Sequence, residues 1–486
     1  MAAYALHLDS SSPSLFSQHA LENQDREMAK NGVSSMEGNQ SMLSILLFPW
    51  LGHGHVSPFL QLAKNLSKRN FKIYFCSTPV SLEPVRGDLA RSSDGATIHL
   101  VELHLPSSPE LPPEYHTTKN IPPNLIPKLF EAFSQSKSSF STILSSLKPD
   151  MVIYDRFQTW AATASLSLGI PAVHFAPGAA AVHSFYYHLA GMTDSPFPYD
   201  ALYLQDYEEK PSANAVVSKV VKEDDQHSGY GHFKLSQDII LVKTSRSFEG
   251  KYIDYLSGLL QKKIVSVGPL IVRATGEDDD SGILQWLSSK SRFSTVFISC
   301  GSENYLSKDQ MQEVAKGLEV SKVNFIWVVR FPQGERVSLD EMLPKGFLDR
   351  VGERGLIVQG WAPQDGILAH PSTGAFVSHC GWNSTLESIH FGVPVISMPF
   401  KLDQPLNARL MVEAGVAVEV VRDGSGNFSS QEFANAIKKV IVEETGQEMR
   451  EKAAELSEKM KNEDERVTNE AAEQLRKICL EHKQKK

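Results

Sequence analysis

Short apolar runs alternate with segments of helical periodicity over most of this 486-residue chain. Such alternation is typical of parallel sheets with helices on both faces. The strand candidates fall into two sets, which are Leu43 to Phe48, Phe71 to Cys76, Ile98 to Leu103, Met151 to Tyr154, Ala172 to Phe175 and Ile239 to Lys243, and then Thr295 to Ser299, Asn324 to Val329, Leu356 to Gln359, Ala375 to Ser378 and Pro394 to Met398. The pattern predicts an α/β protein with two Rossmann-like domains and a cleft between them.

The predicted boundary between these domains is a charged, glycine-containing segment, ATGEDDDSG. We expect an N-terminal domain over residues 43–270, a linker over 271–282, a C-terminal domain over 283–465, and a helix over 466–486 that packs back on the N-terminal domain. The acidic triplet is interpreted as solvated linker rather than as a metal site. Residues 1–42 are polar and lack the apolar core of a signal peptide, so they are predicted to be a disordered extension.

Composition excludes several classes of partner. The net charge of -9 offers no general attraction for nucleic acid or for an anionic membrane. Runs of about 18 apolar residues are missing from the sequence, so no membrane span is expected. The four cysteines are scattered without Cys-x-x-Cys spacing, which indicates reduced thiols in a cytoplasmic protein.

A strand candidate and a helix candidate meet at a glycine turn, and such a junction can bind an anion. The apolar run over residues 374–377 precedes the turn at Gly381, and helical periodicity begins at Asn383. The first turn of a helix leaves backbone N–H groups unpaired and carries the positive end of the helix dipole, so it stabilises a phosphate or diphosphate. The side chains of His379, Asn383 and Ser384 supply further donors. Taken alone, His379 is equally well explained as a strand-end histidine with satisfied hydrogen bonds.

Four more residues complete the outline of a nucleotide-sugar site. Glu387 lies one helical turn after Asn383, where its carboxylate can accept hydrogen bonds from a ribose diol. Trp361 offers a flat indole on which a base can stack. Asp403 and Gln404 can bind sugar hydroxyls. Two of these residues have other interpretations, Trp361 as a core residue and Glu387 as part of a solvated helix face.

The first half of the chain offers a candidate acid–base pair. The first strand candidate leads into His55, and Ser57 and Pro58 are the predicted cap and first residue of a helix. The fourth strand candidate ends at Asp155, at the same edge of the sheet. A free imidazole has a pKa of about 6.5, which suits a general base, and a carboxylate can orient the ring and stabilise its charged form. Alternatively, His55 is a helix-start hydrogen bonder and Asp155 a cap; His53 is the weaker catalytic candidate.

The 44-residue run from Trp361 to Gln404 resembles the signature box of plant UDP-dependent glycosyltransferases. The likeness lies in its length, its tryptophan start, its HCGWNS centre, its glutamate and its Asp-Gln end. The segment GHVSPF is similar to the Gly-His-x-x-Pro segment of the family, and the resemblance extends from Leu43 to the C-terminus. It implies a fold of the GT-B type.

The resemblance also implies a role for each motif residue. His55 is the implied base and Asp155 its partner. The residues implied to bind the UDP-sugar are Trp361 against uracil, Ala362 and Gln364 at its edge, Glu387 at the ribose, His379, Asn383, Ser384 and Ser302 at the diphosphate, and Trp382, Asp403 and Gln404 at the donor sugar.

The implied reaction is inverting transfer of a sugar from a UDP-sugar to a hydroxyl of a small natural product. No cofactor is implied, because the UDP-sugar is a co-substrate, and no metal ion is expected to be required. Stretches such as LVELHLPSSPELPPEYHTT resemble the branch that extends the sugar of flavonoid or terpenoid glycosides. In the family, glutamine at the end of the box accompanies glucose and histidine accompanies galactose, so Gln404 implies UDP-glucose. We expect a monomer.

Several alternatives stay open at this point. The acceptor could be an aglycone hydroxyl, and the donor could be UDP-xylose or UDP-glucuronate, because Ala176-Pro177-Gly178 falls where many relatives carry Thr or Ser near the sugar. Cys300 likewise replaces a usual aromatic residue. A non-catalytic nucleotide-sugar-binding protein is a remote alternative. A dinucleotide-dependent dehydrogenase is disfavoured, because the second strand candidate is not followed by an acidic residue for a ribose diol.

Overall fold

The computed structural model describes residues 42–91, 97–119, 121–192, 195–209, 231–272, 282–331 and 337–485. The predicted extension lies outside the described residues apart from Met42. Most of the predicted linker also lies outside them. Leu43–Lys486 forms one compact unit.

The first half of this unit contains a seven-stranded sheet, in the order β3-β2-β1-β4-β5-β6-β7. All of its strand pairs are parallel. The strands are β1 (Leu43–Phe48), β2 (Phe71–Ser77), β3 (Ile98–Glu102), β4 (Met151–Tyr154), β5 (Ala172–Ala176), β6 (Ile239–Val242) and β7 (Lys263–Ser266). Parallel pairing brings all the carboxyl ends to one edge, where loops can carry functional residues.

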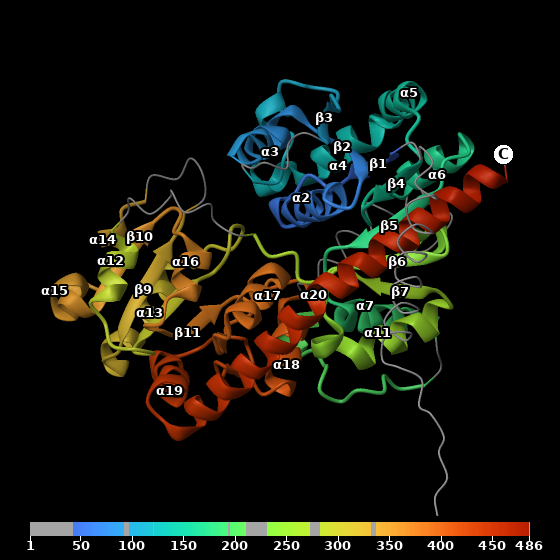
Figure 1. Ribbon diagram of the computed structural model, residues 1–486. Coiled ribbons are helices and arrows are strands. Elements are labelled where there is room, and N and C mark those ends of the chain that lie inside the picture. The colour runs from blue at the N-terminus through green and yellow to red at the C-terminus, as the bar shows by residue number, and fades with distance from the viewer. Residues whose placement is uncertain are drawn as a thin grey trace, which may run out of the picture. The chain divides into compact units, whose positions relative to one another are not determined.

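The second half contains a six-stranded parallel sheet, in the order β10-β9-β8-β11-β12-β13. Its strands are β8 (Thr295–Ser299), β9 (Asn324–Val329), β10 (Gly355–Gln359), β11 (Thr373–Ser378), β12 (Val395–Ser397) and β13 (Ala417–Glu419). Two doubly wound sheets confirm the predicted α/β class with two Rossmann-like domains. Figure 1 shows the helices packed around both sheets.

The helices divide between the two sheets, except for the last. Those of the first half are α2 (His53–Ser67), α3 (Pro79–Arg91), α4 (Ile126–Gln135), α5 (Lys137–Leu147), α6 (Thr159–Ser167), α7 (Ala180–Tyr187), α8 (Asp206–Glu209), α10 (Gly231–Leu235) and α11 (Arg246–Leu260). Those of the second half are α12 (Ile283–Ser288), α13 (Lys308–Ser321), α14 (Leu339–Met342), α15 (Phe347–Val351), α16 (Gln364–Ala369), α17 (Trp382–Phe391), α18 (Gln404–Glu413), α19 (Ser430–Ile441) and α20 (Glu444–Gln484).

Helix α20 connects the cores of both domains. Its Met449 packs with the core of the second sheet, whereas Leu475 packs with the core of the first sheet. Between them, Met460 joins a core cluster with members from both halves of the chain. In Figure 1 this helix, drawn in red, runs from beside α19 past α17 and α11 to β7. The expected boundary between residues 465 and 466 therefore falls inside one continuous helix.

The start of α2 differs from the predicted one. The helix begins at His53 with Gly52 as its cap, and Pro58 lies inside it rather than at its first position. The N–H groups of His55 and Val56 both bond to the Gly52 carbonyl, so the first turn forms before Ser57. Proline costs this helix one backbone hydrogen bond near its start, which the packing of its apolar face offsets. His55 consequently projects from the first helical turn.

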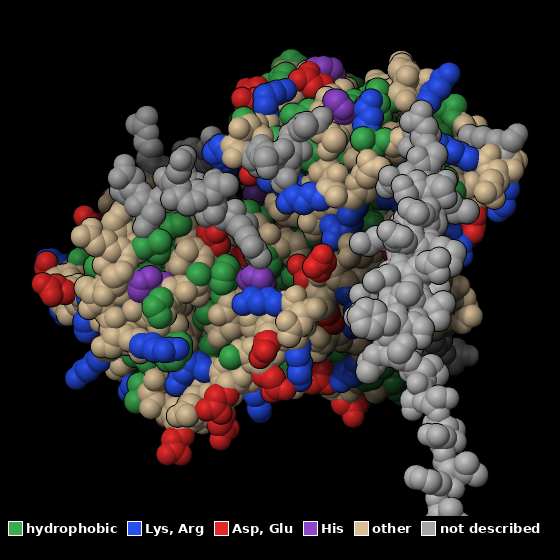
Figure 2. Space-filling model, in the orientation of Figure 1, with side chains coloured by type: hydrophobic (Ala, Val, Ile, Leu, Met, Phe, Trp, Pro, Cys, Tyr) green, Lys and Arg blue, Asp and Glu red, His purple; other side chains and the backbone are tan. Residues whose placement is uncertain are grey.

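Two strands were missed because their sequence signals are weak. Strand β13 has only three residues, and β7 has four and is followed closely by Gly268 and Pro269, which are atypical of strands. The described residues contain no helix that is long and apolar enough to cross a membrane. Basic and acidic side chains are intermixed on the face shown in Figure 2. All four cysteines are buried and unpaired.

A cluster of buried histidines lies beside β4 and β5. Burial lowers the pKa of His174 to about 4 and that of His183 to about 3, and it also lowers the pKa of His232. These rings are therefore neutral at physiological pH. In the unfolded chain they would accept protons below a pH of about 6.5. Each consequently makes the folded state less stable as the pH falls from about 6.5 towards its folded pKa.

We expect His183→Phe to reduce this acid sensitivity. One neutral buried histidine contributes a loss of about 1.4 kcal/mol in unfolding free energy per pH unit over that window. Urea unfolding at several pH values between about 7 and 5 would give the slope for each protein. His99→Phe, at an exposed position, is the matched control. Equal slopes for His183→Phe and the wild type would contradict the assignment.

Candidate active site

His55 and Asp155 meet at the carboxyl edge of the first sheet. The ring atom His55 Nδ1 lies 2.7 Å from Asp155 Oδ2. The same oxygen accepts a hydrogen bond from the backbone N–H of Trp50 at 3.2 Å, and Oδ1 accepts one from the N–H of Arg156 at 2.6 Å. The structure therefore brings together the two residues that the sequence predicted as a pair.

The carboxyl group of Asp155 is fully buried. Burial by itself raises its pKa, but the facing imidazole of His55, both as a charge and as a hydrogen-bond donor, lowers the pKa below its ordinary value. An ionised carboxylate only accepts hydrogen bonds, so Nδ1 of His55 carries the proton. Since the side chain of His55 is 26% exposed, Nε2 is left free to accept a proton from a bound hydroxyl.

Residues of the second domain face this pair. Burial raises the pKa of Asp403, whereas the charges of His55 and Arg156 act to lower it. The carboxylate of Asp403 therefore lies close enough to both residues to interact with their charges. Asp403 accepts a hydrogen bond from Asn407 Nδ2 at 2.9 Å. Its neighbour Gln404 is buried, and its Oε1 accepts hydrogen bonds from the N–H groups of residues 400 and 401. Only Nε2 of Gln404 is then available to donate to a sugar hydroxyl.

The predicted anion site lies at the start of α17. Gly381 caps this helix without a side-chain hydrogen bond, and the N–H groups of Trp382, Asn383 and Ser384 form its first turn. These three donors point along the helix axis towards its N-terminal end. A phosphate placed there would meet backbone donors and the positive end of the dipole.

His379 lies between two glycine residues at this end of the helix. A Cβ atom added to Gly301 would lie 2.5 Å from the His379 ring, and one added to Gly381 would lie 2.4 Å from it. Burial lowers the pKa of His379 to about 4, with a smaller contribution from Lys401, so the ring is neutral. Its buried Nδ1 has no partner among the described residues. A neutral ring with one unpaired nitrogen can serve as a donor to a phosphate oxygen.

Glu387 is not on a solvated face. Burial raises its pKa, and the carboxylate accepts a hydrogen bond from Gln364 Nε2. Gln364 also reaches Ser384 Oγ at 3.4 Å. Lys243, from the end of β6, lies close enough to affect the pKa of Glu387. Lys243 was not among the site residues predicted from the sequence, because a lysine after an apolar strand is ordinarily solvated and nothing local marks this one as buried.

Trp361 is 59% exposed, so it is not a core residue. The guanidinium of Arg330 lies 3.7 Å from its ring centroid, and Lys119 Nζ lies 5.3 Å from it. His53 of the first domain makes an edge contact with the indole at 6.0 Å between ring centroids. His53, the weaker catalytic candidate, thus lies beside Trp361, the predicted base-stacking residue, rather than beside Asp155.

The remaining predicted residues fall into two groups. Ser302 and Ala362 are half-buried and flank the site, Ser302 directly after Gly301. The indole of Trp382 is buried between the domains, where its Nε1 donates to the Lys243 carbonyl at 2.7 Å and its ring stacks on Phe248. This arrangement leaves the backbone N–H of Trp382, rather than its side chain, for a ligand.

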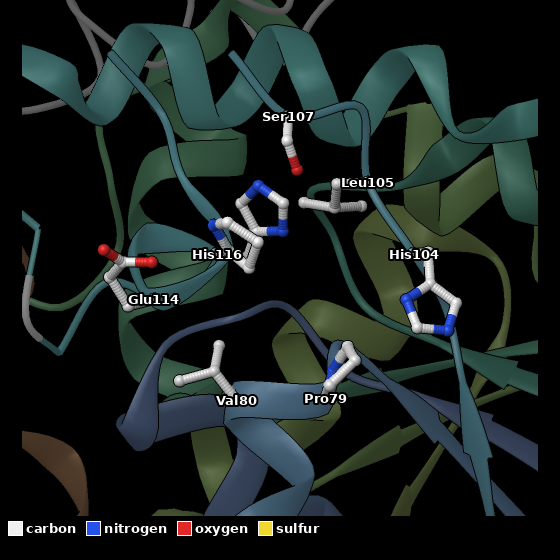
Figure 3. A pocket seen from close by; sticks show the side chains of 8 residues that line it. Pro79, Val80, His104, Leu105, Ser107, Glu114 and His116 are labelled. Carbon is white, nitrogen blue, oxygen red and sulfur yellow. The ribbon is translucent and has the colours of Figure 1, made fainter. Parts of the chain in front are cut away.

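A separate cavity of about 200 Å³ lies in the first domain (Figure 3). It is formed by the start of α3 and the loop that follows β3. Its lining residues are Pro79, Val80, His104, Leu105, Ser107, Pro113, Glu114 and His116. None of the candidate site residues is among them. We therefore assign no role in the reaction to its two histidines.

Comparison with known proteins agrees with this geometry. Residues 281–464 match the family model of UDP-glucoronosyl and UDP-glucosyl transferases, and residues 41–272 match that of the glycosyltransferase N-terminal domain. A beta-D-glucosyl crocetin beta-1,6-glucosyltransferase of Gardenia jasminoides is 47% identical over 90% of this chain and 99% of its own length. The chain belongs to the plant UDP-glycosyltransferase family.

Two further similarities support this membership. A mogroside IIIx synthase of Siraitia grosvenorii is 50% identical over 88% of this chain and 96% of its own. Among solved structures, UGT2 of Phytolacca americana, complexed with UDP-2fluoro-glucose and pterostilbene, aligns with a TM-score of 0.72 and 28% identity over 89% of this chain and 99% of that one. The protein is accordingly a sugar-transferring enzyme with the GT-B fold.

We expect Gly301→Ala to weaken UDP binding. The added methyl group would collide with His379, and the φ angle of +80° at this position is strained for any residue with a side chain. Loss of one hydrogen bond to a charged ligand corresponds to about a ten- to hundred-fold rise in Kd. Titration calorimetry would measure it. Gly258→Ala, where nothing lies within 4 Å of the added atom, is the control, and equal affinity of both variants for UDP would contradict the assigned role of His379.

Proposed function

We propose that this enzyme transfers glucose from UDP-glucose to a sugar hydroxyl of a small-molecule glycoside, namely a terpenoid or flavonoid glycoside. The observation that carries the proposal is the similarity, over nearly the whole chain, to the relative whose name describes glucosylation of beta-D-glucosyl crocetin. We further expect it to act as a monomer in the cytoplasm. Two alternatives are open to experiment. The acceptor could be an aglycone, and the donor could be UDP-xylose or UDP-glucuronate.

His55 would act as the general base. Its Nε2 removes the proton of the acceptor hydroxyl while that oxygen attacks the anomeric carbon from the face opposite UDP. The bond from the new oxygen to the anomeric carbon forms as the bond to the diphosphate oxygen breaks, so the configuration inverts. The adjacent ionised carboxylate of Asp155 holds the ring and stabilises the imidazolium that forms.

The start of α17 would stabilise the leaving group. Negative charge grows on the diphosphate as its bond to the anomeric carbon breaks, and fixed donors aimed at that position lower the barrier most. The proposed donors are the backbone of α17 and the side chains of His379, Asn383, Ser384 and Ser302. Trp361 and Glu387 would hold the uridine, and Asp403 and Gln404 the sugar, with Ala362 and Gln364 beside the base.

We expect His55→Ala to lose transfer but to retain UDP binding. Removal of a general base costs about 10²–10⁴-fold in rate. Single-turnover kinetics measures the chemical step, and calorimetry with UDP checks the donor site. Asp155→Asn should impair the same step, because an amide can neither stabilise the imidazolium nor hold the same tautomer. A His55→Ala enzyme with a near wild-type kcat would show that another group is the base.

We expect glycosides to be converted faster than their aglycones. Pairs of each terpenoid or flavonoid with and without one attached glucose, incubated with UDP-glucose, test this by mass spectrometry. The expected product carries a disaccharide rather than two separate sugars, which fragmentation of the product distinguishes. Faster conversion of the aglycones across the panel would overturn the proposed acceptor class.

We expect UDP-glucose to be the preferred donor. With Oε1 of Gln404 held by two backbone N–H groups, the Nε2 atom must find its acceptor on the sugar. The axial hydroxyl of galactose would leave that contact unmade, at a cost of about 1–3 kcal/mol, roughly ten- to hundred-fold in selectivity. Competition kinetics among UDP-glucose, UDP-galactose, UDP-xylose and UDP-glucuronate decides the donor. A higher kcat/KM for any of the other three would refute the assignment.

A further inference from the structure

Lys243 of the first domain contacts the first turn of α17 in the second domain. Its ammonium donates a hydrogen bond to Asn383 Oδ1 at 2.5 Å, and its carbonyl accepts one from Trp382 Nε1 at 2.7 Å. Only 3% of the residue is exposed. One residue of the first domain thus holds two consecutive residues at the proposed diphosphate site of the other domain.

The ammonium fixes the orientation of the Asn383 amide. An asparagine amide has one accepting oxygen and one donating nitrogen, and a lysine ammonium can only donate. Oδ1 therefore faces Lys243, and Nδ2 is directed away from it. Because diphosphate oxygens at neutral pH only accept hydrogen bonds, this orientation presents Asn383 as a donor.

Lys243 also brings a buried positive charge to the start of α17. Burial lowers the pKa of its ammonium to about 8, and the charge of Glu387 on α17 acts against that shift. The charge of Asp365 on α16 acts to raise the pKa of Glu387. The carboxylate of Glu249 on α11 accepts hydrogen bonds from the Ala181 N–H at the start of α7 and from the Thr244 hydroxyl. At neutral pH the ammonium is protonated, and its charge favours a bound diphosphate.

We propose that Lys243 is a positioning residue for the UDP diphosphate, acting across the two domains through the amide of Asn383 and through its own charge. The inference rests on the proposed function, since it requires UDP to bind with its diphosphate at α17. It assigns a part of the donor site to the first domain. Donor affinity would then depend on this contact of Lys243 with the first turn of α17.

The test compares UDP with uridine, which lacks the diphosphate. We expect Lys243→Met to raise the Kd for UDP by about ten- to hundred-fold, the value of a hydrogen bond to a charged group. The Kd for uridine should stay within about two-fold, which also shows that the variant is folded. Equal weakening of UDP and uridine would indicate a merely structural role, and unchanged UDP binding would refute the inference.

Three comparisons make this assignment specific. Lys243→Arg, which keeps the charge and donors, should recover most of the UDP affinity. Lys251→Met removes a different contact between the domains, the ion pair with Glu413, and should leave the UDP affinity unchanged. The double variant Lys243→Met with Asn383→Ala should lose less UDP-binding free energy than the sum of the losses in the two single variants, because both changes act on one contact. Additive losses, or an equal loss in Lys251→Met, would contradict the mechanism.

A pH titration gives an independent readout. The UDP affinity of the wild type should decline as the pH rises through about 8, where the ammonium of Lys243 loses its proton. The decline should be missing in Lys243→Met and in Lys243→Arg. The same decline in all three proteins would overturn the role of the charge. If the wild type failed to bind UDP at any pH, the proposed function itself would fail, whereas binding unaffected by Lys243→Met would remove only this inference.

Discussion

A buried ionised carboxylate is tolerated only where charge and hydrogen bonds replace its lost water, and Asp155 imposes this requirement on the first domain. Its two oxygens take donors from Trp50, His55 and Arg156, which lie in two segments of the chain. The register of β1 against β4, in which Phe48 pairs with Tyr154, brings those segments together. The carboxylate therefore fixes the loop after β1, the first turn of α2 and the tautomer of His55 at once.

In the proposed function the second domain has the opposite task, since it would bind an anion rather than bury one. The proposed donors are neutral, namely the open first turn of α17 and the histidine held between Gly301 and Gly381. Its half-buried carboxylates, Glu387 and Asp403, have raised pKa values because partial loss of water disfavours their charged form. A hydrogen bond from a ribose or sugar hydroxyl would favour that charged form, so ligand binding and ionisation of these groups support each other.

The sequence predicted those parts of the structure that are encoded locally. The strand, turn and helix around Gly381 are consecutive, and His55 and Asp155 each follow an apolar strand, so their shared edge follows from parallel pairing. Contacts between distant segments had no such signal. Lys243 lies 140 residues before Asn383. The buried indole of Trp382, the short strand β13 and the start of α2 at His53 likewise depend on packing that no local pattern records.

The central claim is that a hydroxyl activated by His55 displaces UDP in one step from the opposite face. The anomeric configuration of the product tests it most directly. Proton NMR of the product made from UDP-α-glucose should show the large coupling between H1 and H2 that marks a β-linked glucose, because a single displacement inverts the configuration. A small coupling, indicating a new α linkage with retention, would contradict the account, since His55 would then not lie on the attacking side.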